Sequence, residues 1–465
     1  MKKLFYLTAM IAIVSSGCRK IEVDGTIIGG NTGSTDTTKT ENTILEGRIT
    51  QNLTLKAANI YKLRGLVYVT NGAILTIEPG TKIVGELNRQ GGLVITRSAK
   101  IIADGTPEKP IVFTSEAANP QRGDWSGVIL LGNAPTNASF NGVQGIGEIE
   151  GGVNNSDGLG LYGTPVTQNQ NPVDNSGILR YVRIEYAGYA FLPDKEINGL
   201  TFGGVGSGTV IDYVQVSYAN DDSFEWFGGT VNCKHLISFR TLDDDFDTDN
   251  GFSGSVQFGI ALRDSAVADI SKSEAFESDN DANGSQLTPQ TKAVFSNMTV
   301  IGPKQNLNNA GSNLFLAGAQ IRRNSSISIF NSIIMGWPTG LLIDASKGYP
   351  TDNNIPGSLF VQNTIISGCS TSINYAASTA TPTGFKVADW FSTVTNNNTI
   401  YNTNDEVKIT AAFNYASPDF TPATGSPALG TALFTNQLLA NKFTNVTYLG
   451  AVGAGDTWWK VWTRF

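Results

Sequence analysis

The sequence predicts an all-β protein built as a right-handed parallel β-helix, a solenoid of stacked strands with terminal caps. The composition is the first observation: 51 glycines and only 15% charged residues favour turns and strands over long helices. The second observation is an internal repeat of short, alternating apolar segments. The third is that no ten-residue helical pattern separates these segments, which argues against a conventional parallel sheet with helical crossovers.

The repeat is visible in two sets of segments. YVRIEYAG begins at Tyr181 and YVQVSYAN at Tyr213, 32 residues later. FSNMTVIG, IFNSIIMG and VQNTIISG place asparagines at Asn297, Asn331 and Asn363, which are 34 and 32 residues apart. Parallel strands stack about 4.8 Å apart, so matching residues of successive turns lie above one another. We therefore expect the three asparagines to form a ladder of amide hydrogen bonds.

Residues 1–17 have the features of a secretory signal peptide, because Lys2 and Lys3 precede a short apolar run. The run is too short to cross a bilayer as a mature helix. The letters SSGC that end at Cys18 resemble the lipobox of bacterial lipoproteins, which implies that Cys18 is acylated. Residues 18–43 are rich in Gly, Thr, Asn and Ser and predict a flexible tether. We expect a lipoprotein anchored in the outer membrane, with display at the cell surface left open.

Residues 44–425 are expected to form the β-helix, and residues 426–465 a closing segment and cap. The last ten residues contain Trp458, Trp459 and Trp462. We expect these rings to cover the open end of the solenoid, where strand edges are otherwise exposed.

Several segments resemble a known family. The runs GAILTIEPGTKI, ADGTPEKPIVFTS, GDWSGVILLGNAP and GTVIDYVQVSYANDDSFEWFGGTV are similar to the β-helix lipoproteins of Bacteroidetes, which have the pectin-lyase-like fold. DFTPATGSPALG also resembles the last-turn signature of many β-helix proteins. The resemblance covers nearly all of residues 44–465. It implies the fold and the lipid anchor, but no particular activity.

Acidic residues concentrate between residues 220 and 281, and two stretches have the alternation of a calcium loop. Asp245, Asp247 and Asp249 alternate in the first, and Asp279, Asp281 and Asn283 precede a glycine in the second, as in the opening of an EF-hand loop. We expect both stretches to bind Ca²⁺. The open alternative is that these residues form solvated turns.

The same acids permit an enzyme on this scaffold. An aspartate-pair glycosidase or a calcium-dependent polysaccharide lyase would use Asp222, Asp244, Asp245 and Arg240, with Arg263 as another possible lyase base. His235, the one histidine of the chain, is expected to be a hydrogen-bonded strand residue. No acid–base motif surrounds the acids, so whether the protein is an enzyme stays open, with binding favoured.

The expected function is therefore a non-catalytic module that holds a glycan or another polymeric nutrient, beside an outer-membrane importer. Trp226 and Phe227 lie near turns, where aromatic rings can stack on sugars, although packing under long loops is the alternative. A purely structural or adhesive surface protein is the remaining alternative. The net charge of −8 argues against nucleic acid as a partner. Cys233 and Cys369 are expected to be small buried side chains rather than a disulfide.

Overall fold

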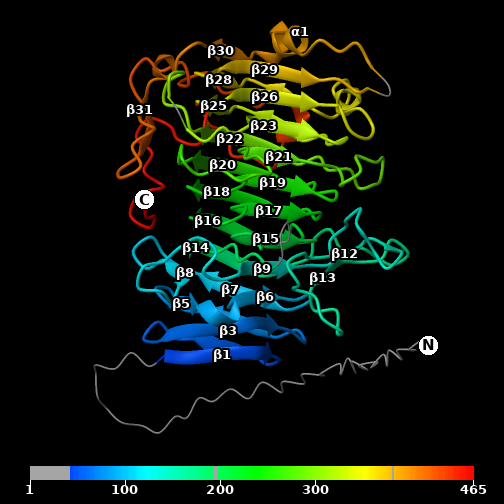
Figure 1. Ribbon diagram of the computed structural model, residues 1–465, viewed down its shortest axis with the longest axis vertical. Coiled ribbons are helices and arrows are strands. Elements are labelled where there is room, and N and C mark those ends of the chain that lie inside the picture. The colour runs from blue at the N-terminus through cyan, green and yellow to red at the C-terminus, as the bar shows by residue number, and fades with distance from the viewer. Residues whose placement is uncertain (1–41, 192–196, 310, 380–381) are drawn as a thin grey trace, which may run out of the picture.

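The chain forms one elongated solenoid of parallel strands. The computed structural model describes residues 42–191, 197–309, 311–379 and 382–465. Cys18, the proposed signal peptide and almost all of the tether lie outside the described residues. Most strands belong to one 26-stranded sheet that winds around the core, with the first turn at one end and the short helix α1 (Val387–Phe391) at the other (Figure 1). The predicted all-β parallel β-helix is confirmed.

The strands stack in three columns. The first column contains β2 (Leu53–Leu55), β4 (Ile74–Ile77), β7 (Lys100–Asp104), the first parts of β14 (Gly177–Glu185), β16 (Val210–Ser217), β18 (Asn232–Phe239), β20 (Ser255–Leu262) and β22 (Val294–Ile301), then β24 (Ser328–Phe330) and β27 (Val361–Gln362). The second column contains β5 (Lys82–Gly85), β8 (Ile111–Ser115), the later parts of β14 to β22, then β25 (Ile333–Met335), β28 (Ile365–Ser367) and β30 (Thr399–Tyr401).

The third column contains β6 (Gly92–Ile95), β9 (Gly127–Leu131), β15 (Leu200–Gly203), β17 (Phe224–Phe227), β19 (Phe246–Asp249), β21 (Phe276–Ser278), β23 (Ala317–Arg322), β26 (Thr339–Asp344) and β29 (Thr371–Ala376). β1 (Asn42–Ile49) pairs along β3 (Ile60–Val69), which itself pairs with both β5 and β6. The third column therefore runs along the whole length of the solenoid.

The remaining elements are short. An insertion between β9 and β14 contains the antiparallel pairs β10 (Ser139–Phe140) with β11 (Val143–Gln144) and β12 (Ile146–Glu148) with β13 (Leu161–Gly163), and β31 (Ile409–Ala411) pairs with β32 (Asp419–Pro422). The 3-10 helices are η1 (Leu87–Arg89), η2 (Thr351–Asn354), η3 (Val394–Asn396), η4 (Asn404–Val407) and η5 (Gln437–Leu439). In the part of the chain that is described, no helix is long and apolar enough to span a membrane.

The length of one turn varies more than the sequence repeat suggests. Val210 lies opposite Ile178 of the preceding turn and opposite Asn232 of the following turn. The chain from Val210 to Asn232 is clearly shorter than the chain from Ile178 to Val210. Ser255 lies opposite Val294, which is the longest of these intervals. The strands keep their register while the connecting turns change length, because loops on the surface tolerate insertion whereas the packed strands do not.

The corner between the first and second columns carries a ladder of side chains. Tyr181, Tyr213, His235 and Phe258 stack here, with the rings of Tyr213 and His235 4.2 Å apart and nearly parallel. Asparagines take over in later turns, and Asn363 donates a hydrogen bond to Asn331 across 2.7 Å. All these residues have positive φ, a conformation that asparagine tolerates well. The predicted ladder is confirmed between Asn331 and Asn363, whereas Asn297 accepts a hydrogen bond from Gln257 instead.

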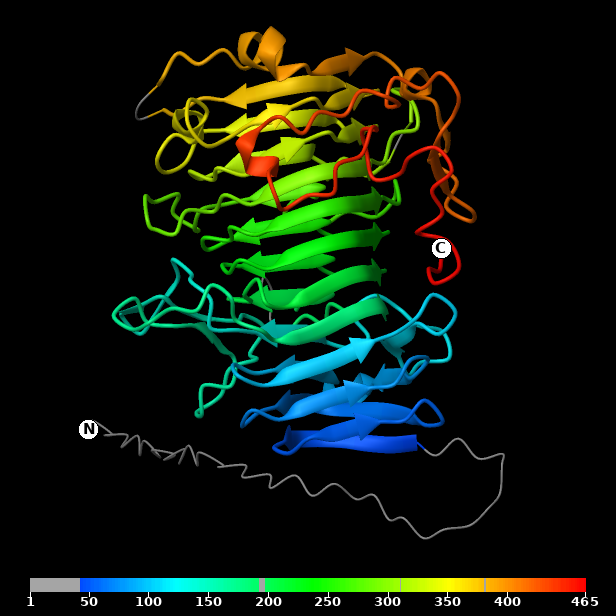
Figure 2. The same cartoon turned by 180° about the vertical axis from the view of Figure 1, so that it is seen from behind.

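The C-terminal segment lies along the side of the solenoid and does not cap its end. It runs back over the outer faces of earlier turns (Figure 2). Trp458 and Trp462 pack against Tyr213, and Arg183 donates a hydrogen bond to the carbonyl of Trp462. The prediction that the three tryptophans close the open end is wrong. Phe391 of α1 joins the interior core at that end instead.

Candidate functional site

Three consecutive turns of the third column repeat one acidic pattern. β17, β19 and β21 each begin with a buried phenylalanine, and Phe224, Phe246 and Phe276 lie opposite one another. An acid precedes each phenylalanine by two residues and another follows it directly. Because successive side chains of a strand point to opposite faces, the acids that follow the phenylalanines point away from the core. These residues are Asp222 and Glu225, Asp244 and Asp247, and Glu274 and Glu277.

Stacking brings carboxylates of neighbouring turns together. Carboxylate oxygens lie within 4.8 Å of one another in three groups: Asp221, Asp222 and Asp243; Asp222, Glu225 and Asp247; and Asp244, Glu274 and Glu277. We call these eight residues the acidic face. Each group combines acids of two adjacent turns, so the turns must be in register for any of the groups to exist.

Burial makes the charged form of the carboxylates on the acidic face energetically unfavourable. Glu274 is only 1% exposed, and in the described part of the chain neither of its carboxylate oxygens has a hydrogen-bond partner. Burial, and then the charge of Glu277, raise the pKa of Glu274 well above its usual range. Burial is also the main reason why the pKa values of Asp243 and Glu277 are raised to about 7. Such carboxylates are stable only when they bind protons or a cation.

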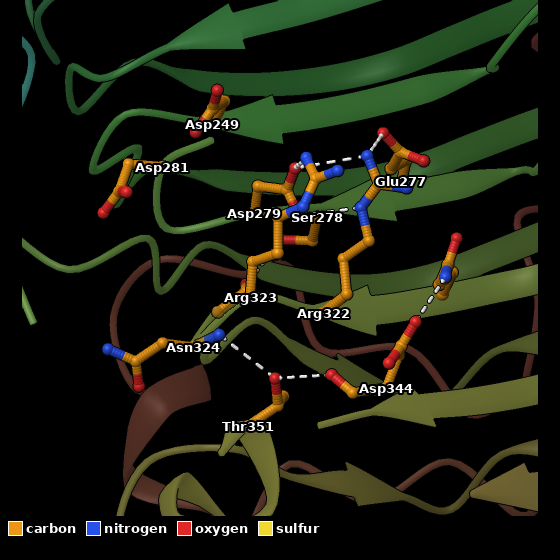
Figure 3. A network of polar contacts seen from close by, with 12 residues as sticks. Asp249, Glu277, Ser278, Asp279, Asp281, Arg322, Arg323, Asn324, Asp344 and Thr351 are labelled. Atoms are coloured by element: carbon orange, nitrogen blue, oxygen red, sulfur yellow. Dashed lines mark hydrogen bonds and ion pairs between the residues drawn. The ribbon is translucent and has the colours of Figure 1, made fainter. Parts of the chain in front are cut away.

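Hydrogen bonds and one ion pair stabilise part of the acidic face. Asn198 donates a hydrogen bond to Glu225, and the backbone N–H of Glu274 donates to Asp244 across 2.6 Å. Arg322 pairs with Glu277 at the edge (Figure 3). Among the described residues, neither carboxylate oxygen of Glu274 accepts a hydrogen bond. A group of carboxylates with unpartnered oxygens is the donor set that a hard cation such as Ca²⁺ prefers, so these residues fit a calcium ion.

The predicted metal ligands do not come together as the sequence suggested. Asp247 belongs to the acidic face. Asp245 is completely buried in the interior, where it pairs with Arg263. Asp249 accepts a hydrogen bond from the backbone N–H of Asn250. The first predicted stretch is therefore split between the inside and the outside of the solenoid.

The second predicted stretch is held by protein groups. Asp279 pairs with Arg322 across 2.8 Å and also with Arg323, whereas the carboxylate of Asp281 lies apart from these arginines (Figure 3). Asp281 accepts hydrogen bonds from the backbone N–H groups of Asn283 and Ser285. These contacts form a turn stabilised by its own backbone, in place of the predicted ligand loop.

The predicted catalytic residues do not all lie at one site. Asp222 and Asp244 lie on the acidic face, but Asp245 points into the core. Arg240 pairs with Asp264, and although burial opposes the charge, this contact raises the pKa of Arg240. Arg240 therefore holds its proton and is a poor base. His235 is a strand residue that shares a hydrogen bond with Asp212 across 2.7 Å, as expected.

The predicted ligand-binding aromatic residues lie in packed surroundings. Trp226 is completely buried and stacks between Phe202 and Phe252, with ring centroids 5.3 Å apart in each case. A surface role for Trp226 is therefore excluded, because its side chain points into the solenoid. Phe227 points the other way, is half-buried and packs against Tyr162. Cys233 and Cys369 are buried free thiols, as expected.

Glu225 belongs to the acidic face and was not among the sequence-based candidates. The signal was present in the segments DDSFE, DDDFD and SEAFE, which repeat an acid at the same two distances from a phenylalanine. The unequal spacing of Phe224, Phe246 and Phe276 along the chain hid it. Calcium-loop spacing instead drew attention to residues neighbouring along the chain, whereas the groups form across turns.

The comparison with protein families agrees with this architecture. Residues 47–413 match the family model described as a pectate-lyase-like β-helix domain. Among solved structures, the crystal structure of pectate lyase Pel9A is similar at 12% sequence identity and a TM-score of 0.33, covering 90% of this chain and 86% of that chain. No curated protein matches the sequence.

Proposed function

Because the chain belongs to the family of pectate-lyase-like β-helix domains, we propose that it is a non-catalytic, calcium-dependent module that binds a polymeric glycan on its acidic face. One observation carries this proposal. Glu274 is buried beside Asp244 and Glu277, and neither of its carboxylate oxygens has a hydrogen-bond partner among the described residues. A folded protein keeps such a group charged only if a cation compensates it.

Two of the three groups on the acidic face would each hold one cation. Asp244, Glu274 and Glu277 would hold one cation, and Asp222, Glu225 and Asp247 would hold another one turn away. Calcium held by these carboxylates would supply the positive charge that attracts hydroxyl or carboxylate oxygens of a glycan. Because the two groups follow the solenoid axis, a chain-like ligand that lies along the third column meets both of them.

Binding is favoured over catalysis by the states of the neighbouring arginines. Arg240 and Arg263 are both paired with aspartates. The two arginines predicted as bases are therefore already engaged in ion pairs, which leaves the binding of a cation and a ligand as the role of the acids.

A second function, a calcium-dependent lyase, is favoured by the environment of Arg122. Burial, and then the charges of Arg263 and Arg240, lower the pKa of Arg122 to about 10. Its guanidinium donates a hydrogen bond to the carbonyl of Ala219 across 3.1 Å, two residues before Asp221. An arginine with a lowered pKa close to a metal-binding face is a candidate base for proton abstraction.

Polysaccharide retention with product analysis tests the proposed function. The protein should retain a glycan in millimolar calcium and release it in chelator, with no new reducing ends or unsaturated products. Glu274→Gln should weaken calcium binding by at least about tenfold, since it removes a charged ligand. Asp344→Asn is the matched control, because Asp344 belongs to the same column but to none of the three acidic groups. Unsaturated products that disappear in Arg122→Lys would establish the lyase instead.

We also propose that Cys18 is lipidated and holds the module at the outer membrane, near a polymer importer. The support is the SSGC sequence that follows the apolar run, together with the Gly- and Thr-rich stretch after it. Cys18→Ala should move the protein from the membrane to the soluble fraction and abolish labelling by a fatty-acid analogue. Continued membrane partition of this variant would contradict the anchor, and protease treatment of intact cells would test surface display.

A further inference from the structure

A second polar site lies at the other end of the third column, away from the acidic face. A cleft of about 460 Å³ opens between the turns that follow β3 and β6 and the loop of residues 157–159. That loop belongs to the insertion that stands off the side of the solenoid near β9 (Figure 1). The cleft is lined by Thr70, Asn71, Gly72, Thr96, Arg97, Ser98, Asn133, Asp157, Gly158 and Leu159.

Arg97 is the residue that gives this cleft its charge. It is half-buried, and its guanidinium donates only one hydrogen bond within the described part of the protein, to the carbonyl of Gly163 across 3.3 Å. Burial lowers the pKa of Arg97. Asp157 is the one acid in the lining, and it pairs with Arg48. Arg97 therefore forms no ion pair with a described residue, and most of its donors are unused within the described part of the protein.

The surrounding side chains are short and polar. Asn71 and Ser98 occupy corresponding turns, both with positive φ. In the described part of the chain, neither side chain makes a hydrogen bond, and both residues are exposed. Hydroxyl and amide groups that line an open cleft match the hydroxyl groups of a sugar, and Leu159 is the only large apolar residue among the described lining residues.

We propose that this cleft binds a carboxylate-bearing sugar, with Arg97 pairing with the carboxylate and Asn71 and Ser98 donating to or accepting from the sugar hydroxyls. A planar guanidinium binds a carboxylate through two parallel hydrogen bonds, which neutralises the buried charge. The volume of the cleft admits a sugar ring with its substituents. The site needs no metal, and it is therefore independent of the calcium-dependent function proposed for the acidic face.

The test is calorimetric titration of the purified protein with glucuronate in the presence of chelator, which silences the acidic face. Glucose and acetate are the neutral and the sugar-free probes. We expect glucuronate to bind, and glucose and acetate to bind at least about tenfold more weakly, because each lacks one half of the recognition. Arg97→Gln should reduce glucuronate affinity by at least about tenfold, and Arg97→Lys should restore only part of it.

Two further variants test whether binding depends on the residues of the cleft. Arg89→Gln removes an exposed arginine that pairs with Glu46 outside the cleft, and it should leave the affinity unchanged. Asn71→Gly keeps the positive φ without strain while it removes the amide, and it should weaken binding several-fold with an unchanged melting temperature. The proposal is overturned if glucuronate does not bind, if Arg97→Gln binds it as well as the parent, or if acetate binds equally tightly. Loss of calcium binding in Glu274→Gln with intact glucuronate binding separates the two sites.

Discussion

Arg263 and Asp245 form an ion pair in the interior of the solenoid, with 3.2 Å between Nη1 and Oδ1 and both side chains completely buried. Ser238 donates a hydrogen bond to the same carboxylate oxygen, and Arg263 also donates to the carbonyl of Leu242 across 3.0 Å. The pair thereby joins the strands of one turn to the loop of the next.

Removal of one partner of this pair should be strongly destabilising. Arg263→Met leaves the carboxylate of Asp245 buried alone, and we expect a loss of about 3–5 kcal/mol in the free energy of unfolding. The double variant Arg263→Met/Asp245→Leu should recover part of that loss, because it leaves no uncompensated charge. Denaturant titration of both variants checks this, and equal losses in the single and double variants would contradict it.

The acidic face should make stability fall as the pH rises in chelator. The pKa values of Asp243 and Glu277 are raised to about 7 in the folded protein, against about 4 in an unfolded chain. Between these values the folded state keeps protons that the unfolded state releases, so the free energy of unfolding decreases with pH. We expect a lower melting temperature at pH 8 than at pH 5, and recovery at pH 8 when calcium is added. An equal or higher melting temperature at pH 8 without calcium would contradict this account.

The asparagine ladder should contribute measurably to stability. Asn363 donates to Asn331 and to the carbonyl of Thr431, and it accepts a hydrogen bond from Asn397. Asn363→Ala leaves these buried partners without their hydrogen bonds. It also puts alanine at a positive φ, which asparagine tolerates better. We expect the free energy of unfolding to fall by about 2 kcal/mol or more. Asn353→Ala is a control at an exposed asparagine outside the ladder. Thermal unfolding that is equal for the two variants would argue against the ladder.

The C-terminal segment should hold the side of the solenoid and not its end. A chain truncated after Asp456 loses Trp458, Trp459 and Trp462 and exposes Tyr213 and His235. We expect a lower melting temperature, with faster hydrogen exchange in β14, β16 and β18 but unchanged exchange in β28 and β29. Faster exchange confined to β28 and β29 would instead support an end cap.

The two thiols of the solenoid should be unreactive in the native protein. Burial raises the pKa of Cys369 to about 11 and that of Cys233 further. In the Cys18→Ala protein, a thiol reagent at pH 8 should label neither cysteine until denaturant is added, because the thiolate is the reactive form. Rapid labelling of either cysteine under native conditions would show that its turn opens readily.

The architecture follows from local features of the sequence. Alternating apolar residues, frequent turn residues and matching asparagines at Asn331 and Asn363 are local properties, and each of them specifies the same stacked strand. Those signals predicted the solenoid, the ladder and the strand position of His235. They failed at the C-terminus because an aromatic-rich segment can pack on an open end or on a side. The stacked rings of Tyr181, Tyr213 and His235 on the outer side of the strands decided between the two.

The candidate site depended on the tertiary structure. Asp245 and Asp247 are two residues apart in the sequence, yet one pairs with Arg263 in the core and the other meets Glu225 of the preceding turn outside. The groups of the acidic face join residues of adjacent turns, and their separation along the chain changes with the length of the connecting turn. A pattern along the chain does not predict these contacts. The register of the stacked strands sets which carboxylates meet and which arginine pairs with them.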